Sequence, residues 1–294
     1  MERISFYDQI AANKRKSYFL MFLVFLVLIL LGYVISMAVD PGYFFFIMIF
    51  SIIFSLSYIL ISYYNSDKIA LASVNAKPAD RRMSRQYYDS VEGLCLASGM
   101  PMPKLYVMNN EQINAFATGR DPNHAVVCVT AGALSKLNKG ELEGVLSHEM
   151  SHIANYDIRF MTLVAVMVGM IAIISEIFLR SMWFKSNDRD SGKAGVIFLI
   201  LGIILAILAP IVVQLVQLSI SRKREFTADA TAVKFTRTPT GLIGALKKIK
   251  NDVPMKTSKA VSSLFMSDPK RSKFQNLFST HPDINMRIKI LEQM

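Results

Sequence analysis

The sequence predicts a mainly α-helical membrane protein, with four transmembrane helices and a cytoplasmic α+β domain that contains a small β-sheet. Two observations carry this prediction. Four apolar runs interrupt the 294 residues, each close to or above the roughly 20 residues that a helix needs to cross a bilayer. The segments between and after these runs are polar and mixed, and they include short stretches with β character.

The first two apolar runs, residues 17–39 and 43–64, contain no charged side chain. Asp40-Pro41-Gly42 joins them as a turn, in which Pro stops one helix and Gly allows the reversal. The first run is too long for a signal peptide, has no small-residue cleavage site and is followed at once by a second run. We therefore expect a transmembrane hairpin, with a buried soluble core as the alternative.

The second pair of apolar runs, residues 160–179 and 194–220, is less uniform. The first contains Glu176, and the second contains Pro210, which should kink its helix, and two glutamines. Such polar groups can lie at an interface or face protein. We expect both runs to span the membrane, and a hairpin partly shielded by the polar part of the chain is the alternative.

Positive charge orients the chain. Lys14-Arg15-Lys16 precedes the first span, and the first turn has no Lys or Arg, so the positive-inside rule places the N-terminus and residues 65–159 in the cytoplasm. Two further spans return residues 222–224, Arg-Lys-Arg, to the same side. The basic residues of the 180–193 loop would then lie outside, against the rule. The predicted location is the cell inner membrane, in a multi-pass arrangement.

These spans divide the chain into four parts. They are the N-terminal segment with the first hairpin (1–64), the first part of the cytoplasmic domain (65–159), the second hairpin (160–221) and the second part of the cytoplasmic domain (222–294).

The net charge of +11 is explained mostly by these membrane flanks and by attraction to anionic lipid of the cytoplasmic leaflet. No basic stripe interleaved with aromatic residues appears in the soluble part, so we expect no nucleic-acid partner. Cys95 and Cys128 form no CxxC pair and indicate free or buried thiols in a reducing compartment.

His148-Glu149-Met150-Ser151-His152 is the stretch with the clearest chemistry. On a helix, positions i and i+4 share one face, so both imidazoles can reach one metal ion. Glu149 then lies beside that metal, where a carboxylate can take a proton from a zinc-bound water. Early acidic residues and Asn138 as N-cap predict the helix itself. The motif predicts one Zn²⁺ per chain and hydrolysis, with a chance match as the alternative.

A catalytic zinc ion takes three protein ligands, so a third must lie elsewhere. His124, His281 and any acid on an adjacent helix are candidates. Glu225 and Asp229 are four residues apart on the segment that continues the fourth apolar run. One can bind zinc while the other accepts a hydrogen bond from the far nitrogen of a zinc-bound His. The alternative is a solvated helix with Glu225 paired to an Arg.

Several segments together resemble the HtpX family. They are HEMSH at 148–152, SRKREFTADA at 221–230, NAFATG at 114–119 and THP at 280–282. Members of this family are bacterial membrane-integrated zinc metalloproteases of the gluzincin type, linked to heat-shock quality control of membrane proteins. The resemblance covers nearly the whole chain. It implies a zincin-like catalytic domain, His148, His152 and Glu225 as zinc ligands, and Glu149 as the catalytic base.

Two segments with β character, Leu105–Met108 and Ala125–Val129, flank the NAFATG segment. A strand edge beside the zinc could hold an extended peptide through main-chain hydrogen bonds, which makes Asn114, Ala115 and Phe116 candidate substrate-binding residues. A plain structural strand is the alternative. His281 could stabilise the oxyanion or be an ordinary surface residue.

The sequence thus predicts an endopeptidase that cleaves misfolded or damaged membrane proteins, the substrate class that the resemblance implies. The stretch Lys247–Lys273 could serve as a lid or as a self-cleavage target. One alternative is a protease for prenylated C-terminal tails, although such enzymes carry more spans. A second is a non-catalytic membrane scaffold stabilised by zinc, which an intact Glu149 disfavours.

Overall fold

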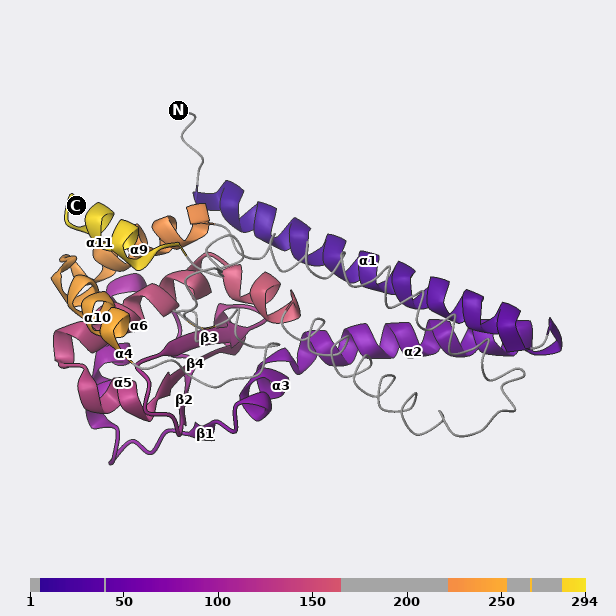
Figure 1. Ribbon diagram of the computed structural model, residues 1–294, viewed down its shortest axis with the longest axis horizontal. Coiled ribbons are helices and arrows are strands. Elements are labelled where there is room, and N and C mark those ends of the chain that lie inside the picture. The colour runs from indigo at the N-terminus through magenta and orange to yellow at the C-terminus, as the bar shows by residue number, and fades with distance from the viewer. Residues whose placement is uncertain (1–5, 40, 165–221, 253–264, 266–281) are drawn as a thin grey trace.

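The computed structural model describes residues 6–39, 41–164, 222–252, 265 and 282–294 (Figure 1). Its helices and strands, in chain order, are α1 (Phe6–Val39), the 3-10 turn η1 (Pro41–Tyr43), α2 (Phe44–Tyr64), α3 (Ser66–Ser73), β1 (Lys77–Pro78), α4 (Arg85–Ser98), β2 (Lys104–Met108), β3 (Ala115–Gly119), the 3-10 turn η2 (Pro122–His124), β4 (Ala125–Thr130), α5 (Ala131–Lys136), α6 (Lys139–Ala154), α9 (Arg222–Thr236), α10 (Thr240–Asn251) and α11 (Ile284–Leu291).

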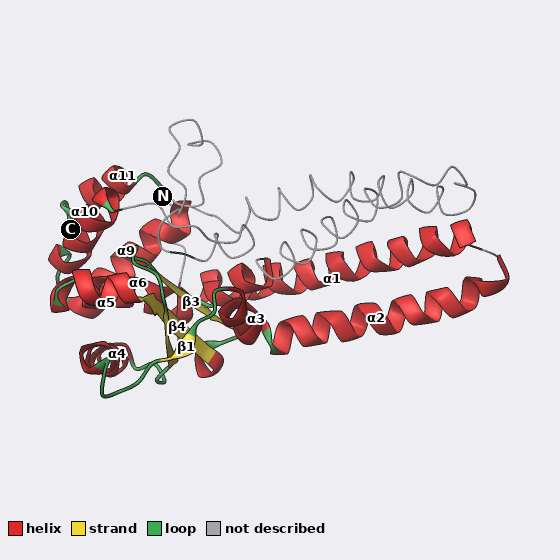
Figure 2. Ribbon diagram, turned by 60° about the horizontal axis from the view of Figure 1, so that its bottom comes forward, coloured by secondary structure: helices red, strands yellow, loops and turns green. Residues whose placement is uncertain are grey.

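The first two helices form a hairpin that projects away from the rest of the molecule (Figures 1 and 2). α1 and α2 contact each other, and Gly32 lies so close to Ser51 that an added Cβ would overlap the Ser51 hydroxyl. Small residues at this contact let the two backbones approach, as in membrane helix pairs. α1 starts well before the apolar run, because the charged residues ahead of position 17 continue the same helix.

By length and composition alone, one helix of the described residues, α2, is apolar enough to cross a bilayer. The predicted second hairpin lies almost wholly in residues 165–221, outside the described residues. The expectation of four transmembrane helices is therefore not confirmed, whereas a mainly helical protein with a small sheet is.

The sheet has four strands in the order β1-β2-β4-β3. β2 runs parallel to β4, and β3 runs antiparallel to β4 and forms one edge. The segments expected to be strands are strands, because their β-branched and aromatic residues fit a pleated surface that is buried here. One face of the sheet packs in a core with α4, α6 and α10, and β3 lies beside α6.

α6 contains the HExxH motif and is largely buried in this core. Asn138 caps the helix as predicted: its side chain accepts from the backbone of Glu141, whose carboxylate accepts in return from the Asn138 backbone. At Gly144 an added Cβ would lie 2.4 Å from the backbone nitrogen of Leu242, so only Gly permits this crossing of α6 and α10. The capped and tightly packed helix provides a rigid base for the motif.

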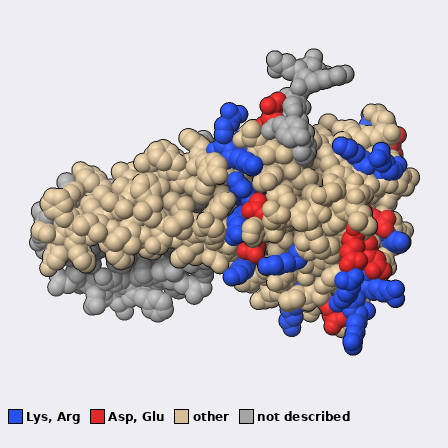
Figure 3. Space-filling model, turned by 180° about the vertical axis from the view of Figure 1, so that it is seen from behind, with Lys and Arg blue, Asp and Glu red and all other residues tan. Residues whose placement is uncertain are grey.

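Basic and aromatic side chains meet where the hairpin joins the rest of the molecule. Lys14 lies 4.4 Å from the centre of the Tyr156 ring, and Arg120 lies 5.0 Å from that of Tyr64. Figure 3 shows the same pattern at the surface: Lys and Arg gather at the foot of the hairpin, while the hairpin face in view has none. Such a boundary is typical of a protein that enters a membrane.

Candidate metal centre

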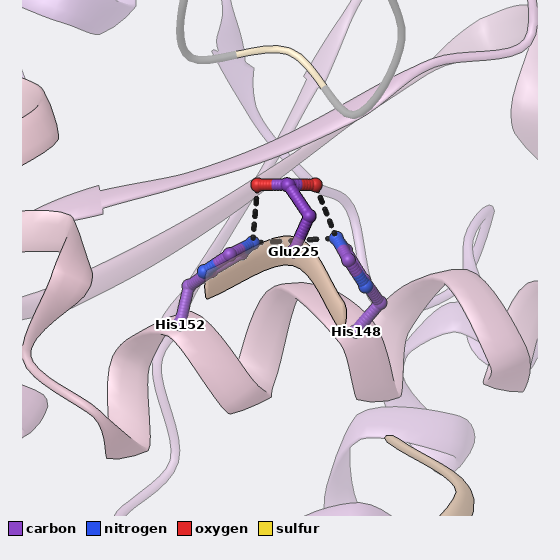
Figure 4. Close-up of side chains that lie close together, drawn as sticks. All are labelled: His148, His152 and Glu225. Carbon is purple, nitrogen blue, oxygen red and sulfur yellow. Dashed lines mark hydrogen bonds and ion pairs between the residues drawn. The ribbon is translucent and has the colours of Figure 1, made fainter. Parts of the chain in front are cut away.

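Two neighbouring elements bring together the three expected ligands. α6 presents His148 and His152 one turn apart, and Glu225 reaches them from α9 (Figure 4). The two Nε2 atoms are 3.3 Å apart, and each lies 3.6 Å from an oxygen of the Glu225 carboxylate. All three side chains are buried. Among the described residues, this is the one group of three His, Cys, Asp or Glu side chains spaced to hold a metal ion.

The spacing fits zinc. Ligand atoms about 2.0–2.1 Å from a tetrahedral ion lie about 3.3–3.4 Å from one another. The observed 3.3 Å and 3.6 Å separations are close to these values. Two imidazole nitrogens and one carboxylate are also a donor set of catalytic zinc sites, which leave a further position for water. The residues present therefore fit the ion that the motif predicts.

His148 is held from its far side by two buried charges. Its Nδ1 lies 2.9 Å from Oδ1 of Asp229, and Arg287 of α11 donates to both oxygens of that carboxylate, at 2.9 Å and 2.6 Å. Nη2 of Arg287 is also 3.3 Å from Nδ1 of His148. Because an ionised carboxylate can only accept a hydrogen bond, the Nδ1 proton belongs to the bond with Asp229. In the neutral ring, the Nε2 lone pair then faces the cluster.

These contacts change the acidities of the group. Burial raises the pKa of Asp229, but the charge of Arg287 and the hydrogen bond from His148 outweigh it and hold the pKa at about 2. Burial and Arg287 lower the pKa of His148, while the hydrogen bonds to Asp229 and Glu225 raise it to about 9 in the metal-free protein. Metal binding must displace that proton, since only the neutral imidazole is a ligand.

His152 has a different set of partners. Its Nδ1 lies 3.0 Å from Oδ2 of Asp157, in the turn that follows α6. The other oxygen, Oδ1, accepts from Nδ2 of Asn13 at 2.7 Å, and Arg224 lies 4.0 Å away. Asp157 and Asn13 are both buried. Each histidine of the motif thus has a carboxylate behind it.

Sequence reasoning missed Asp157, Asn13 and Arg287. For Asp157 a signal existed, since it is an acid five residues after the second histidine. For Asn13 and Arg287 no local pattern exists. They lie 142 and 139 positions from the residues they contact, Asn155 and His148.

The remaining candidates fall in several places. Glu149 follows His148 on α6 and is buried. Asn114, Ala115 and Phe116 lie in or next to the edge strand β3, and all three are buried. His124 is half exposed beside Asp121 in the η2 turn, away from the cluster. His281 lies outside the described residues.

Comparison with known proteins assigns the family. Residues 81–294 match the profile of Peptidase family M48. The chain belongs to this family. It is 45% identical over 100% of its length to a protease HtpX homolog of Caldanaerobacter subterraneus subsp. tengcongensis, of which it covers 99%. A second HtpX homolog, of Thermoanaerobacter pseudethanolicus, is 43% identical at 100% and 99% coverage.

A third HtpX homolog, of Streptococcus pneumoniae, is 39% identical over 98% of this chain and 99% of its own length. The expected resemblance to HtpX is thereby confirmed, and the M48 chain is a metalloprotease. Among solved structures, Ste24p of S. mikatae is similar at 20% identity with a TM-score of 0.47, over 96% of this chain and 65% of that one. That similarity is too low to support an argument.

Proposed function

We propose that this M48 protein is a membrane-embedded zinc endopeptidase that cleaves misfolded or damaged membrane proteins. One observation carries the catalytic part: His148, His152 and Glu225 converge at ligand spacing, with Glu149 next in the chain to the first of them. Zinc bound there would polarise the scissile carbonyl and lower the pKa of water. A site of purely structural zinc would have no use for Glu149, which disfavours the scaffold alternative.

The side chains have separate tasks in this proposal. Glu149 takes a proton from the attacking water and later passes it to the leaving amine. Asp229 and Asp157 accept from the Nδ1 atoms of His148 and His152, which fixes both tautomers with Nε2 toward the ligand cluster. Because both carboxylates are buried, these orientations do not depend on exposed, mobile groups.

Substrate would bind along β3. This strand forms an edge of the sheet and lies beside α6, so an extended peptide paired with it would run past the metal ligands. Asn114, Ala115 and Phe116 are the residues proposed to line that path, and the chain's own 247–273 stretch is a candidate for self-cleavage. Cleavage of prenylated C-terminal tails is the alternative, and it would need an apolar channel that leads to the metal ligands.

For the membrane part we propose that the hairpin spans the inner membrane and that residues 65–159 and 222–294 form one cytoplasmic domain. The contact of α6 with α9 supports the union of the two halves. The long apolar helix α2 and the basic foot of the hairpin support the placement. Both halves must share a compartment, because Glu225 has to reach the two histidines.

Thiol labelling tests this topology. With Cys95 and Cys128 replaced, a cysteine at Gly42 in the hairpin turn should react with a membrane-impermeant reagent in intact cells. A cysteine at Met83, which is 88% exposed, should react only after the cells are opened. Labelling of position 83 in intact cells would place the metal centre outside the cytoplasm.

The catalytic proposal is tested by two substitutions and a control. Glu149→Gln should retain about one zinc per chain and lose several orders of magnitude in cleavage of a membrane-protein substrate, because Gln cannot take a proton. Glu225→Ala should lose tight zinc binding itself. Glu143→Gln, on the same helix but with a side chain 34% exposed in an ion pair with Lys139, should change neither. Wild-type proteolysis by Glu149→Gln would remove that residue from the mechanism.

A further inference from the structure

The start of the first helix is tied to the metal centre through one neutral side chain. Asn13 lies on α1, next to Lys14, yet only 5% of its surface is exposed. Its Nδ2 donates to Oδ1 of Asp157 at 2.7 Å and to the carbonyl of Asn155 at 3.1 Å. Both protons of the amide are thereby used on the turn that ends α6.

Asp157 is the point where this connection reaches the ligand. Its two oxygens have separate partners: Oδ1 accepts from Asn13, and Oδ2 accepts from Nδ1 of His152. A carboxylate that is fixed at one oxygen can rotate less about its side-chain bonds. The Asn13 bond therefore limits where Oδ2, and hence the His152 ring, can lie.

The backbone of the same turn has an unusual conformation. Tyr156, between the two residues that Asn13 contacts, has φ of 59°, in the left-handed region that residues other than Gly seldom adopt. Lys14 lies over the Tyr156 ring at 4.4 Å, so α1 contacts all three residues of the turn. The turn is thus held in its conformation by the helix that leads into the hairpin.

We propose that Asn13 is a positioning residue for the metal centre, by which α1 orients Asp157 and, through it, the His152 imidazole. This inference rests on the proposed role of His152 as a ligand. It makes the affinity for metal depend on the docking of the N-terminal part of α1. A shift of the hairpin relative to α6 would therefore change the metal affinity. Asn13 itself touches neither ligand nor substrate.

Metal affinity measures this role directly. We expect Asn13→Ala to weaken zinc binding by roughly 3- to 10-fold in competition with a chelator, and Asn13→Leu, which keeps the branching and the number of side-chain heavy atoms, to do the same. The loss should be smaller than that caused by replacing Asp157, which contacts His152 directly. Ser17→Ala is the matched control, because Ser17 is buried one turn further along α1 and bonds the Asn13 carbonyl. It should bind zinc as the wild type does.

Two readouts separate positioning from a general loss of stability. The visible spectrum of the Co²⁺-substituted protein should change in both Asn13 variants and stay unchanged in Ser17→Ala. In an Asp157→Asn background, Asn13→Ala should have little further effect on zinc affinity, because the connection is already broken. Unchanged zinc affinity in both Asn13 variants would overturn the inference. So would an Asn13→Ala effect that is as large in the Asp157→Asn background as in the wild type.

A different result would refute the proposed function, and it can be told apart from a failure of the positioning role. If His152→Ala kept stoichiometric zinc, the ligand assignment would fall, whatever Asn13 does. If His152→Ala lost zinc while Asn13→Leu bound it normally, only the positioning role would fall.

Discussion

The two histidines of the motif are alike in sequence and differ in what lies behind them. His148 is backed by Asp229 and Arg287, a fully buried charge pair from the C-terminal part of the chain. His152 is backed by Asp157, whose other oxygen accepts from the neutral amide of Asn13 at 2.7 Å and has Arg224 only at 4.0 Å. Removing half of a buried ion pair leaves an uncompensated charge, whereas removing a neutral donor leaves one bond unmade. The His148 side should therefore be the more sensitive one.

The largest effect is expected at Arg287. Arg287→Ala removes the two hydrogen bonds and the charge of Arg287 and leaves the buried Asp229 with His148 alone, so the free energy of unfolding of the metal-free protein should fall by roughly 3–5 kcal/mol. Arg287→Lys keeps the charge but cannot make the bidentate interaction with Asp229. Its free energy of unfolding should therefore lie between those of Arg287→Ala and the wild type. Denaturant unfolding in detergent measures both. A loss below about 1 kcal/mol for Arg287→Ala would show that the Asp229–Arg287 pair stabilises the site no more than the Asp157–Asn13 contact does.

The next prediction compares the two carboxylates themselves. Asp229→Asn and Asp157→Asn should each weaken zinc binding by roughly 10- to 100-fold, as expected for partners that orient a ligand. The loss should be larger for Asp229→Asn, because Arg287 then loses its closest countercharge and keeps only Glu225, at 3.9 Å. Chelator competition gives the two dissociation constants, and the reverse order would contradict the comparison.

A smaller effect should appear as a function of pH. The pKa of Asp229 in the folded protein is about 2, below its ordinary 3.8, so its ionised form stabilises the fold. This contribution is complete above about pH 4 and is lost as the pH falls toward about 2; from the shift in pKa it is on the order of 2 kcal/mol. In the metal-free protein, the stability difference between wild type and Asp229→Asn should narrow by that amount over this range. A constant difference would mean that Asp229 is not titrating there.

Much of the site could be predicted from the sequence, because it depends on local geometry. The pitch of a helix places His148 and His152 on one face, and the Asn138 cap that begins this helix is readable from residue types alone. The same holds for Glu225 and Asp229, four apart on α9. The strands were predictable from β-branched runs, and the first hairpin from two uncharged stretches around Asp40-Pro41-Gly42.

The tertiary structure alone decided which side chains contact the two histidine ligands from the side away from the metal. Nothing in the local sequence connects Asn13 with Asp157 or Arg287 with Asp229, since such contacts arise only when distant elements pack into one core. It also decided which acid serves which histidine: Asp229 faces His148, and Asp157 faces His152. Helical periodicity acts over one or two turns, whereas the pairing of buried polar groups across more than a hundred residues is set by the packing that removes them from water.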